Sequence, residues 1–306
     1  MFFNGYLLKE YKYNTIDVTY SVIVPIYNQE DIIEKNINSI IKFTKGNFEL
    51  IIILDFCFDN TENILINMLN NYKNDKSYFA GIKIYKQEEY PIFEASCDNV
   101  GFKNSNGRFC LEIQSDMEMV QDGYNLHLSK PFNLLDNIIA VGGRLCCAVT
   151  QCPPNLKYHN VIQLLPDLNT NVENKSIDKN TFYVYDTVAR GPILFDKKKL
   201  IEMDYIDEKN CYQQNSDHEL LIRSYLEKQY ICGYVPITFK APIKDGTDRK
   251  DKSGYYLKRN REKQIINNNQ KKKRGHWWGN NPIKNSEKWV SKKLIKYDIE
   301  KIEYIL

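Results

Sequence analysis

Two short apolar runs, separated by a segment with helical periodicity, constrain the fold of this chain more than any other feature. Tyr20–Ile26 (YSVIVPI) and Phe48–Leu54 have the length and the β-branched content of buried strands. Between them, isoleucines at positions 32, 33, 37, 40 and 41 recur at the spacing of an amphipathic helix. A strand, a helix and a second strand in this order indicate a right-handed crossover within a parallel sheet.

The same alternation continues toward the C-terminus. We expect strands at Ile82–Tyr85, Phe109–Ile113, Ile138–Val141, Gly191–Phe195 and Tyr230–Val235, and helices around Ile64–Leu69, Ala95–Ser105 and Asp217–Leu226. The expected fold class is α/β, with a mainly parallel, Rossmann-like sheet, helices on both faces and a basic C-terminal extension.

Three segments depart from this alternation or end it. The helix at Ala95–Ser105 is expected to close at Asn106-Gly107, because such a pair is typical of helix C-caps. Gly143–Tyr185 is polar, and we interpret it as a long loop. Lys244–Asn285 is basic and loop-like, and Glu287–Tyr304 is expected to form a closing helix.

Composition excludes several classes of protein. The 306 residues include 42 Lys plus Arg against 39 Asp plus Glu, a net charge of +3, which argues against a dedicated nucleic-acid binder. No apolar run approaches the roughly 20 residues of a membrane-spanning helix, and the first residues lack a secretory-signal pattern. The eight cysteines show no paired metal-binding spacing. We therefore expect a soluble, cytoplasmic protein with reduced thiols.

Acidic residues stand where the expected strands end, and parallel sheets bind ligands at that edge. Asp55 directly follows the second strand, and its carboxylate can accept hydrogen bonds from a base or a ribose. Asp116 and Glu118 follow the strand at Phe109–Ile113, and two nearby carboxylates suit Mg²⁺ or Mn²⁺. Asp217 opens a helix, where an acidic residue is also expected from the helix dipole alone.

Four segments together resemble the family 2 glycosyltransferases of the GT-A fold, over about residues 20–235. SVIVPIYNQEDIIEKNINSI resembles the family's first strand and helix, and IIILDFCFDNT is similar to its second strand. CDNVGFKNSNGRFCLEIQSDME resembles its Arg-Asn-x-Gly helix and metal-binding Asp-x-Asp turn, and SDHELLIRSY resembles its late Glu-Asp motif. The resemblance implies that a nucleotide-diphosphate sugar, most often a UDP-sugar, gives its sugar to an acceptor hydroxyl with inversion.

The resemblance also implies a role for each of several residues. The nucleotide would be bound by Pro25, Tyr27, Asn28, Asp55, Asn99 and Ser115, with Asp55 on the base. Mn²⁺ or Mg²⁺ would be held by Asp116, Glu118 and, from a C-terminal flap, His276, and would neutralise the departing diphosphate. Asp217 would be the general base. A glycan or other hydroxyl-bearing acceptor would contact Asp186, Arg190, Gly191 and Trp277, although Asp186 and Arg190 also suit a loop salt bridge.

The resemblance divides the chain into two parts. Residues 1–235 would form the GT-A domain, with a nucleotide-sugar half at about 20–142 and an acceptor half at about 143–235. Residues 236–306 would form the C-terminal flap and a helical tail. The basic run Lys271, Lys272, Lys273 and Arg274 lies in that flap, and its alternatives are a solvated face or a peripheral contact with anionic lipids.

Several positions depart from the family pattern. Phe56, Cys57 and Phe58 replace polar residues, which predicts a more apolar base pocket. Asp98 stands where the family often has Arg, Gln114 occupies the first acidic position of the metal turn, and Ser216 replaces the Glu before Asp217. Two alternatives follow. One is a non-catalytic carbohydrate- or partner-binding protein on a decayed transferase scaffold. The other is a sugar nucleotidyltransferase, although PIYNQED lacks the glycine-rich loop of that class.

Overall fold

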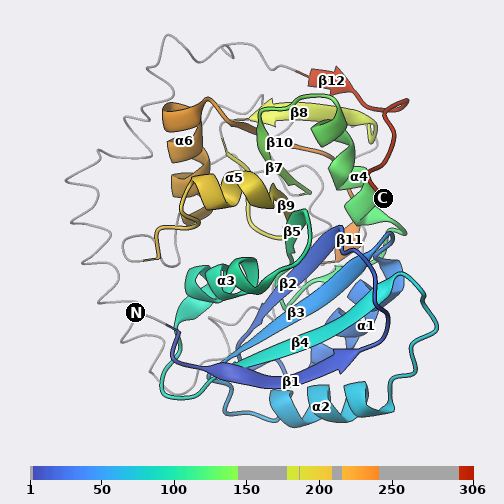
Figure 1. Ribbon diagram of the computed structural model, residues 1–306, viewed down its shortest axis with the longest axis vertical. Helices are drawn as coiled ribbons and strands as arrows, with labels where there is room; N and C mark the ends of the chain where they lie inside the picture. Colours follow the sequence, from blue (N-terminus) through green and yellow to red (C-terminus); the bar gives the residue numbers. More distant parts are fainter. Residues whose placement is uncertain (1–2, 144–177, 186, 209–215, 241–295) are drawn as a thin grey trace, which may run out of the picture.

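The first half of the chain builds a parallel sheet by alternating strands and helices (Figure 1). The structure, a computed structural model, describes residues 3–143, 178–185, 187–208, 216–240 and 296–306. Strands β2 (Tyr20–Ile26), β3 (Phe48–Asp55), β4 (Phe79–Gln87) and β5 (Phe109–Glu112) are separated by helices α1 (Ile33–Phe43), α2 (Thr61–Asn71) and α3 (Phe93–Asn104). The neighbours run β4-β3-β2-β5, and each of these pairs is parallel, as the alternation predicted.

The second half extends the same sheet with mixed strand directions. It contributes β7 (Ile138–Gly142), β8 (Thr181–Tyr185), β9 (Ile193–Asp196), β10 (Ile231–Tyr234) and β12 (Lys296–Asp298). Strand β9 is antiparallel to both β5 and β7, and β10 is parallel to β7. With β1 (Tyr6–Lys12) at one edge, the described residues form a ten-stranded sheet ordered β1-β4-β3-β2-β5-β9-β7-β10-β8-β12.

Smaller elements complete the described part of the chain. They are helices α4 (Tyr124–Ser129), η1 (Lys130–Asn133), α5 (Lys197–Glu202) and α6 (Ser216–Lys228), and the short strands β6 (Glu118–Met119) and β11 (Phe239–Lys240). Strands β6 and β11 pair antiparallel in a separate two-stranded ribbon. This pairing brings the chain after β10 back beside the residues that follow β5.

Helices cover both faces of the sheet, because side chains of successive strand residues point to opposite sides. On one face Val22 and Val24 of β2 join α1 through Ile37 and Ile40 in a single apolar core. On the other face Ile23 belongs to a second core, which is formed with helices α3, α5 and α6. Strand β2 is buried along its whole length, as expected for a parallel strand with helices on both sides.

Three expectations about local structure are wrong. The helix expected at Glu287–Tyr304 is contradicted by strand β12 at Lys296–Asp298, which pairs with β8 at the sheet edge. The loop expected over Gly143–Tyr185 ends in strand β8, which is buried at every position. A short strand of this kind is stabilised by neighbours distant in sequence, so its local pattern is weak.

The third error concerns the end of α3. The helix ends at Asn104, and the cap residue Ser105 is extended (φ −75°, ψ 148°). Asn106 instead donates through its backbone N–H and its side-chain Nδ2 to the Glu49 carboxylate, at 2.6 and 2.9 Å. The Asn106-Gly107 pair therefore serves a tertiary contact with β3 and not a left-handed cap.

Two further features concern the helices and the cysteines of the described residues. In the described ranges, every helix is too short or too polar to cross a membrane. The four cysteines within those ranges, Cys57, Cys97, Cys110 and Cys232, carry free thiols. The division of the chain into a domain of residues 1–235 and a C-terminal part of residues 236–306 stays a prediction.

Candidate functional site

Strands β2 and β5 separate at the carboxyl edge of the sheet, and Pro25 marks the place. Their pairing ends at Ile23 and Glu112, where the Ile23 carbonyl accepts a hydrogen bond from the Ile113 N–H at 3.0 Å. The backbone N–H and C=O groups of successive strand residues point alternately to the two neighbouring strands, so those of residue 25 point toward β5, as those of residue 23 do. A proline is tolerated there, since β5 no longer needs a donor from that position. The sheet thus opens between these two strand ends.

Asp55 ends β3 and holds the beginning of α3. Its Oδ1 accepts from the Ile92 N–H at 2.7 Å, and its Oδ2 accepts from the Phe93 N–H at 2.8 Å. Only 4% of Asp55 is exposed. The carboxylate thereby satisfies two of the backbone donors that a helix N-terminus leaves without an intrahelical partner. Phe93 has φ of +67°, a left-handed conformation that is uncommon for an aromatic residue and is stabilised here by these contacts.

The loops after β2 and β3 bind each other. Asn28 Oδ1 accepts from the Phe58 N–H at 3.0 Å, and Cys57 Sγ donates to the Ile26 carbonyl at 3.4 Å. The Tyr27 and Phe58 rings meet edge to face, with centroids 5.9 Å apart. Tyr27 is buried, but Phe58 is 55% exposed. The Phe58 ring is therefore exposed to solvent at the edge of the sheet, while its backbone is held by the contacts between the loops after β2 and β3.

The turn that carries Asp116 is held by α1. Met117 N–H donates to the Gln114 carbonyl at 3.1 Å and closes the turn. Asn36, buried on α1, donates from Nδ2 to the carbonyls of Gln114 at 3.1 Å and Met117 at 2.6 Å. Ser115 is also buried in this turn. An amide with two carbonyl acceptors fixes the backbone on both sides of Asp116.

Glu118 lies on β6 and forms an ion pair with Lys240 of β11, with 3.1 Å between Oε1 and Nζ. Both side chains are partly exposed, so the pair stabilises the fold by at most about 1 kcal/mol. Residues 236–240 thus run beside the acidic turn. Sequence reasoning had no signal for this contact, since the two residues are far apart in the chain.

Arg190 forms two ion pairs with α3, and the pair with Asp98 is buried. Its Nη1 lies 2.9 Å from Glu94 Oε2, and its Nη2 lies 2.8 Å from Asp98 Oδ2. Arg190 is 8% exposed and Asp98 is 1% exposed. Asp98 is therefore matched by an Arg from a distant segment of the chain.

Glu112 is a functional-site candidate that sequence reasoning missed. Its Oε2 accepts from the Gly191 N–H at 2.7 Å, and the residue is 1% exposed. Burial raises the pKa of the Glu112 carboxyl well above its ordinary value, and Asp98 and Glu94 act in the same direction. Arg190 and the Gly191 N–H oppose that rise. The available signal was a carboxylate inside an otherwise apolar strand, FCLE.

Other predicted site residues are placed differently or lie outside the described residues. Asn99 donates to the Ile206 carbonyl at 2.9 Å and accepts from the Ile206 N–H at 3.1 Å, so it anchors the chain that follows α5. Asp217 is the second residue of α6, and its side chain is outside the described part. Asp186, His276, Trp277 and the run Lys271–Arg274 also lie outside the described residues.

The donor set suits one kind of metal site. Within the described ranges, no three His, Cys, Asp or Glu side chains gather around a common point that could hold a metal. Mg²⁺ and Mn²⁺ sites on phosphate substrates commonly use one or two protein carboxylates, with phosphate and water as the other ligands. Asp116, on a turn held by Asn36, fits that pattern as a single anchoring carboxylate.

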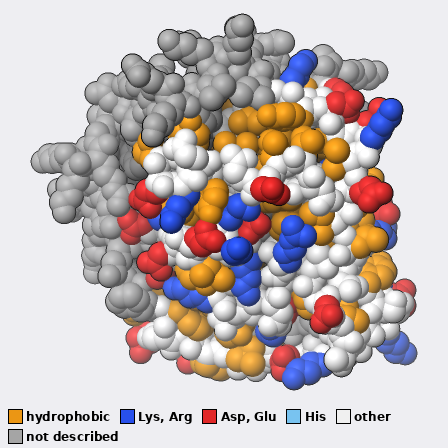
Figure 2. Space-filling model, turned by 45° about the horizontal axis from the view of Figure 1, so that its top comes forward, with side chains coloured by type: hydrophobic (Ala, Val, Ile, Leu, Met, Phe, Trp, Pro, Cys, Tyr) orange, Lys and Arg blue, Asp and Glu red, His pale blue; other side chains and the backbone are white. Residues whose placement is uncertain are grey.

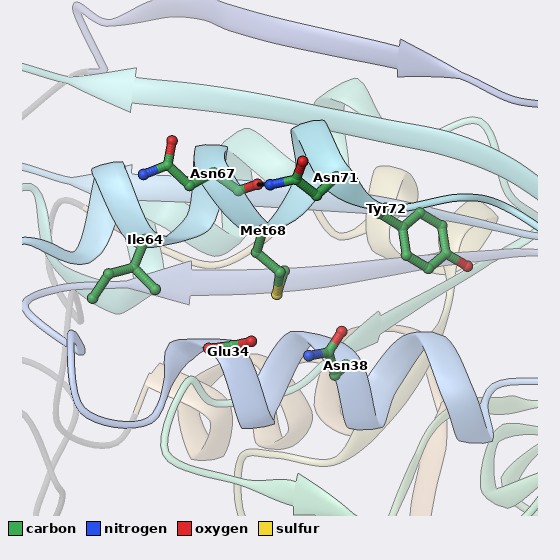
Figure 3. Close-up of a pocket in the computed structure, with 7 residues that line it drawn as sticks. All are labelled: Glu34, Asn38, Ile64, Asn67, Met68, Asn71 and Tyr72. Atoms are coloured by element: carbon green, nitrogen blue, oxygen red, sulfur yellow. Dashed lines mark hydrogen bonds between the residues drawn. The ribbon is translucent and has the colours of Figure 1, made fainter.

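A separate groove of about 540 Å³ lies between α1 and α2 (Figure 3). It is lined by Glu34, Asn38, Ile64, Asn67, Met68, Asn71 and Tyr72. Figure 3 shows Glu34 and Asn38 on α1 facing Met68 on α2. The strand-end residues described above do not line it.

In the face that Figure 2 shows, Lys and Arg side chains stand among Asp and Glu side chains, in keeping with the near-neutral charge.

Comparisons with known proteins agree with this architecture. Residues 21–147 match the family described as "Glycosyl transferase family 2". An "Uncharacterized glycosyltransferase" of Rickettsia bellii (strain RML369-C) is 35% identical over 102 residues, which are 33% of this chain and 13% of that protein. The chain therefore spans only a small part of this curated relative.

Solved structures share the fold at low sequence identity. S. aureus TarS 1–349 in complex with UDP-GlcNAc has a TM-score of 0.53 at 19% identity, covering 76% of this chain and 61% of that one. The mannosyltransferase PcManGT of Pyrobaculum calidifontis, in complex with GDP-Man and Mn²⁺, has a TM-score of 0.52 at 11% identity, covering 86% and 66%. At such identities the similarity establishes the fold alone.

Proposed function

Because residues 21–147 match glycosyl transferase family 2 and the sheet has the GT-A fold, we propose that this chain transfers a sugar from a UDP-sugar to an acceptor hydroxyl. The transfer inverts the anomeric carbon and needs a divalent metal. The activity of the whole protein, its donor and its acceptor are part of this proposal.

One observation carries the proposal. The ends of β3, β2 and β5 are adjacent at one edge of the sheet, and each is followed by residues that suit a nucleotide-sugar. Asp55 ends β3, Tyr27 and Asn28 follow β2, and the Asp116 turn follows β5. Open α/β sheets bind ligands at such an edge.

The nucleotide would lie over the β2 and β3 ends. Pro25 opens the sheet there, and Tyr27 and Asn28 line the edge. Each oxygen of the Asp55 carboxylate has two lone pairs, so it can accept from a base N–H while it still holds Ile92 and Phe93. Phe58 would add an apolar ring face against the base, since stacking on an aromatic side chain tolerates any base.

The diphosphate would lie toward the β5 end. Asp116, with Ser115 beside it, would hold a Mn²⁺ or Mg²⁺ there, and Glu118 and His276 are the further candidate ligands. The metal would neutralise negative charge on the leaving diphosphate. The similar PcManGT was solved with GDP-Man and Mn²⁺, which supports this choice of cofactor. Asn99 stays a proposed donor contact only through its place on α3, because its amide binds Ile206.

Asp217 would remove the proton from the acceptor hydroxyl. The acceptor oxygen forms a bond to the anomeric carbon as the bond to the diphosphate breaks, and the proton passes to the Asp217 carboxylate. Asp217 is the second residue of α6, in which Arg223 pairs with Glu219 at 2.9 Å. Arg223 Nη2 also donates to the Tyr205 carbonyl at 2.9 Å, and this contact holds α6 against the chain that follows α5. A glycan or other hydroxyl-bearing acceptor is proposed to contact Asp186, Arg190, Gly191 and Trp277. The basic run Lys271–Arg274 is proposed to contact an anionic membrane surface on the cytoplasmic side.

Calorimetry of UDP binding tests the donor half of the proposal. We expect UDP to bind in the presence of Mn²⁺ and to lose at least about 10-fold in affinity for Asp116→Asn, which removes a carboxylate ligand. Asp122→Asn is the matched control, because Asp122 is an exposed acid six residues after Asp116 and pairs with Lys45. Binding that ignores both Mn²⁺ and Asp116→Asn would refute the proposal.

Hydrolysis of UDP-sugars separates an enzyme from a non-catalytic binder. Slow release of UDP that requires Asp217 and Asp116 would indicate transfer chemistry with water in place of the acceptor. The variants are Asp217→Asn, Asp116→Asn and the control Asp122→Asn. Equal release from all three variants would contradict catalysis at this edge.

A further inference from the structure

Gln114 donates a hydrogen bond that a carboxylate in its place could not make. Its Nε2 lies 2.7 Å from Oε1 of Glu94 on α3. The Glu94 side chain is 26% exposed, so this contact is partly shielded from water. A donor amide stabilises the Glu94 carboxylate, whereas an acid at position 114 would repel it.

The same Glu94 carboxylate binds Arg190 with its other oxygen. Glu94 Oε2 lies 2.9 Å from Arg190 Nη1, and Arg190 Nη2 lies 2.8 Å from Asp98 Oδ2. Gln114, Glu94, Arg190 and Asp98 thus form one continuous chain of contacts, named here the relay. It joins the Asp116 turn to α3, the helix whose first residues hold Asp55.

The turn is confined from two more sides. A β-carbon on Gly191 would lie 2.9 Å from Gln114 Cγ, so the segment after Arg190 packs directly on Gln114. Glu112 fixes that segment by accepting from the Gly191 N–H at 2.7 Å. Asn36 holds the turn from the side of α1. Gln114 therefore has little freedom to leave Glu94.

We infer that Gln114 is a positioning residue, which sets the Asp116 turn against α3 through the relay and so couples the metal end of the donor site to its nucleotide end. This inference rests on the proposed function. Gln114 is then an adaptation to Glu94 and Arg190, and not a metal ligand that the chain has lost.

A reciprocal exchange tests this assignment. Gln114→Glu places two carboxylates against each other. Glu94→Gln keeps a carbonyl oxygen for Arg190 and offers an amide to position 114, so the double variant rebuilds the contact with the donor reversed. The four proteins are the wild type, the two single variants and the double variant. Glu34→Gln, at an exposed position of α1, is the control for loss of an acid.

Thermal unfolding without ligand measures the contact itself. We expect Gln114→Glu to lower Tm by about 3 °C and the double variant to recover most of that loss. Glu34→Gln should leave Tm within about 1 °C of the wild type. A double variant whose loss equals the sum of the two single losses would overturn the relay.

Mn²⁺-dependent UDP binding measures its consequence. Gln114→Glu should weaken UDP binding about 10-fold, and the double variant should return to within about 3-fold of the wild type, since coupled residues deviate from additivity. Tighter Mn²⁺ binding by Gln114→Glu would overturn the inference, because position 114 would then be a ligand position. A wild type that binds no UDP would overturn the proposed function, and the unfolding experiment would still decide whether the relay exists.

Discussion

Gly191 packs against Gln114 so closely that only a residue without a side chain fits. A β-carbon at position 191 would lie 2.9 Å from Gln114 Cγ and 3.1 Å from Gln114 N, and the residue has φ of +46°. Position 191 is 77 residues from position 114 in the chain, yet the fold brings the two into direct contact. Arg190, the residue before Gly191, pairs from this position with Glu94 and Asp98 of α3.

Gly191→Ala should destabilise the fold by about 2 to 4 kcal/mol, from a strained left-handed backbone and a crowded neighbour. Thermal or urea unfolding measures the loss. Gly123→Ala is the matched control, since Gly123 also has positive φ (+64°) but its β-carbon would meet only atoms at 3.7 Å and beyond. The control should lose roughly 1 to 2 kcal/mol. Equal losses of stability in the two variants would mean that the close approach of residue 191 to Gln114 adds no destabilisation.

Asn36→Asp should loosen the Asp116 turn. The substitution replaces the Nδ2 donor with an acceptor that faces the carbonyls of Gln114 and Met117. We expect a loss of about 2 to 4 kcal/mol in stability, because one buried and one partly buried carbonyl lose their donor beside a buried charge. Calorimetry should also show weaker Mn²⁺-dependent UDP binding. Asn38→Asp, exposed on the same helix, is the control, and a similar effect from it would contradict this role of Asn36.

Phe58→Ala should weaken UDP binding with little effect on folding. The ring is 55% exposed, so its removal leaves no core cavity. Stacking of a base on an aromatic side chain contributes about 1 to 3 kcal/mol, which corresponds to roughly 5- to 150-fold in affinity. Phe58→Tyr should retain the affinity, and Ile201→Ala removes an equally exposed apolar side chain elsewhere. Unchanged UDP affinity in Phe58→Ala would place the base away from this ring.

Glu49→Gln should destabilise the fold and spare UDP binding. The buried carboxylate accepts from Ser21 Oγ at 2.6 Å, Lys83 Nζ at 3.0 Å and two groups of Asn106. Loss of the charge leaves Lys83 without its anionic partner, and we expect the free energy of unfolding in urea to fall by about 2 to 4 kcal/mol. Glu49 lies six residues before Asp55 on β3, about 20 Å from the candidate site. Glu10→Gln at the surface is the control, and a large change in UDP affinity would count against the assigned site.

His127 should make stability depend on pH below neutrality. Burial lowers its pKa, and Lys130 and Lys179 act in the same direction against the hydrogen bond to the Lys179 carbonyl. Between the folded pKa and about 6.5, the unfolded chain binds more protons, so stability falls as the pH drops through this window. His127→Gln removes that titration. As the pH falls from 7.5 to 5.5, the Tm of the variant should therefore rise relative to the Tm of the wild type. A difference between the two Tm values that stays constant over this range would contradict the expectation.

The parallel half of the sheet could be predicted from local patterns because each of its elements is buried on a regular face. The apolar run at β3 and the isoleucines of α1 fold as their periodicity indicates. Strand β12 and the closing strand β8 could not be predicted in this way. Lys296–Asp298 is short and largely exposed, and it is a strand because β8 offers it an edge.

The candidate site shows the same division. Asp55 and the Asp116 turn were predicted to stand at strand ends, and the structure places them there. The partners of these residues were not predictable. Asp55 accepts from the start of α3, Glu118 pairs with Lys240, and Arg190 enters from a segment far along the chain.

By itself, the sequence determined the order of strands and helices and the chemical types of residue at the strand ends, because periodicity and turn residues act over a few neighbours. Only the tertiary structure decided which charges meet. Asp98 and Arg190 lie 92 residues apart, and their 2.8 Å ion pair exists because β9 returns antiparallel beside β5. A buried charge is costly unless it is paired. The sequence shows which charged residues are present, but only the fold determines which of them lie close enough to pair.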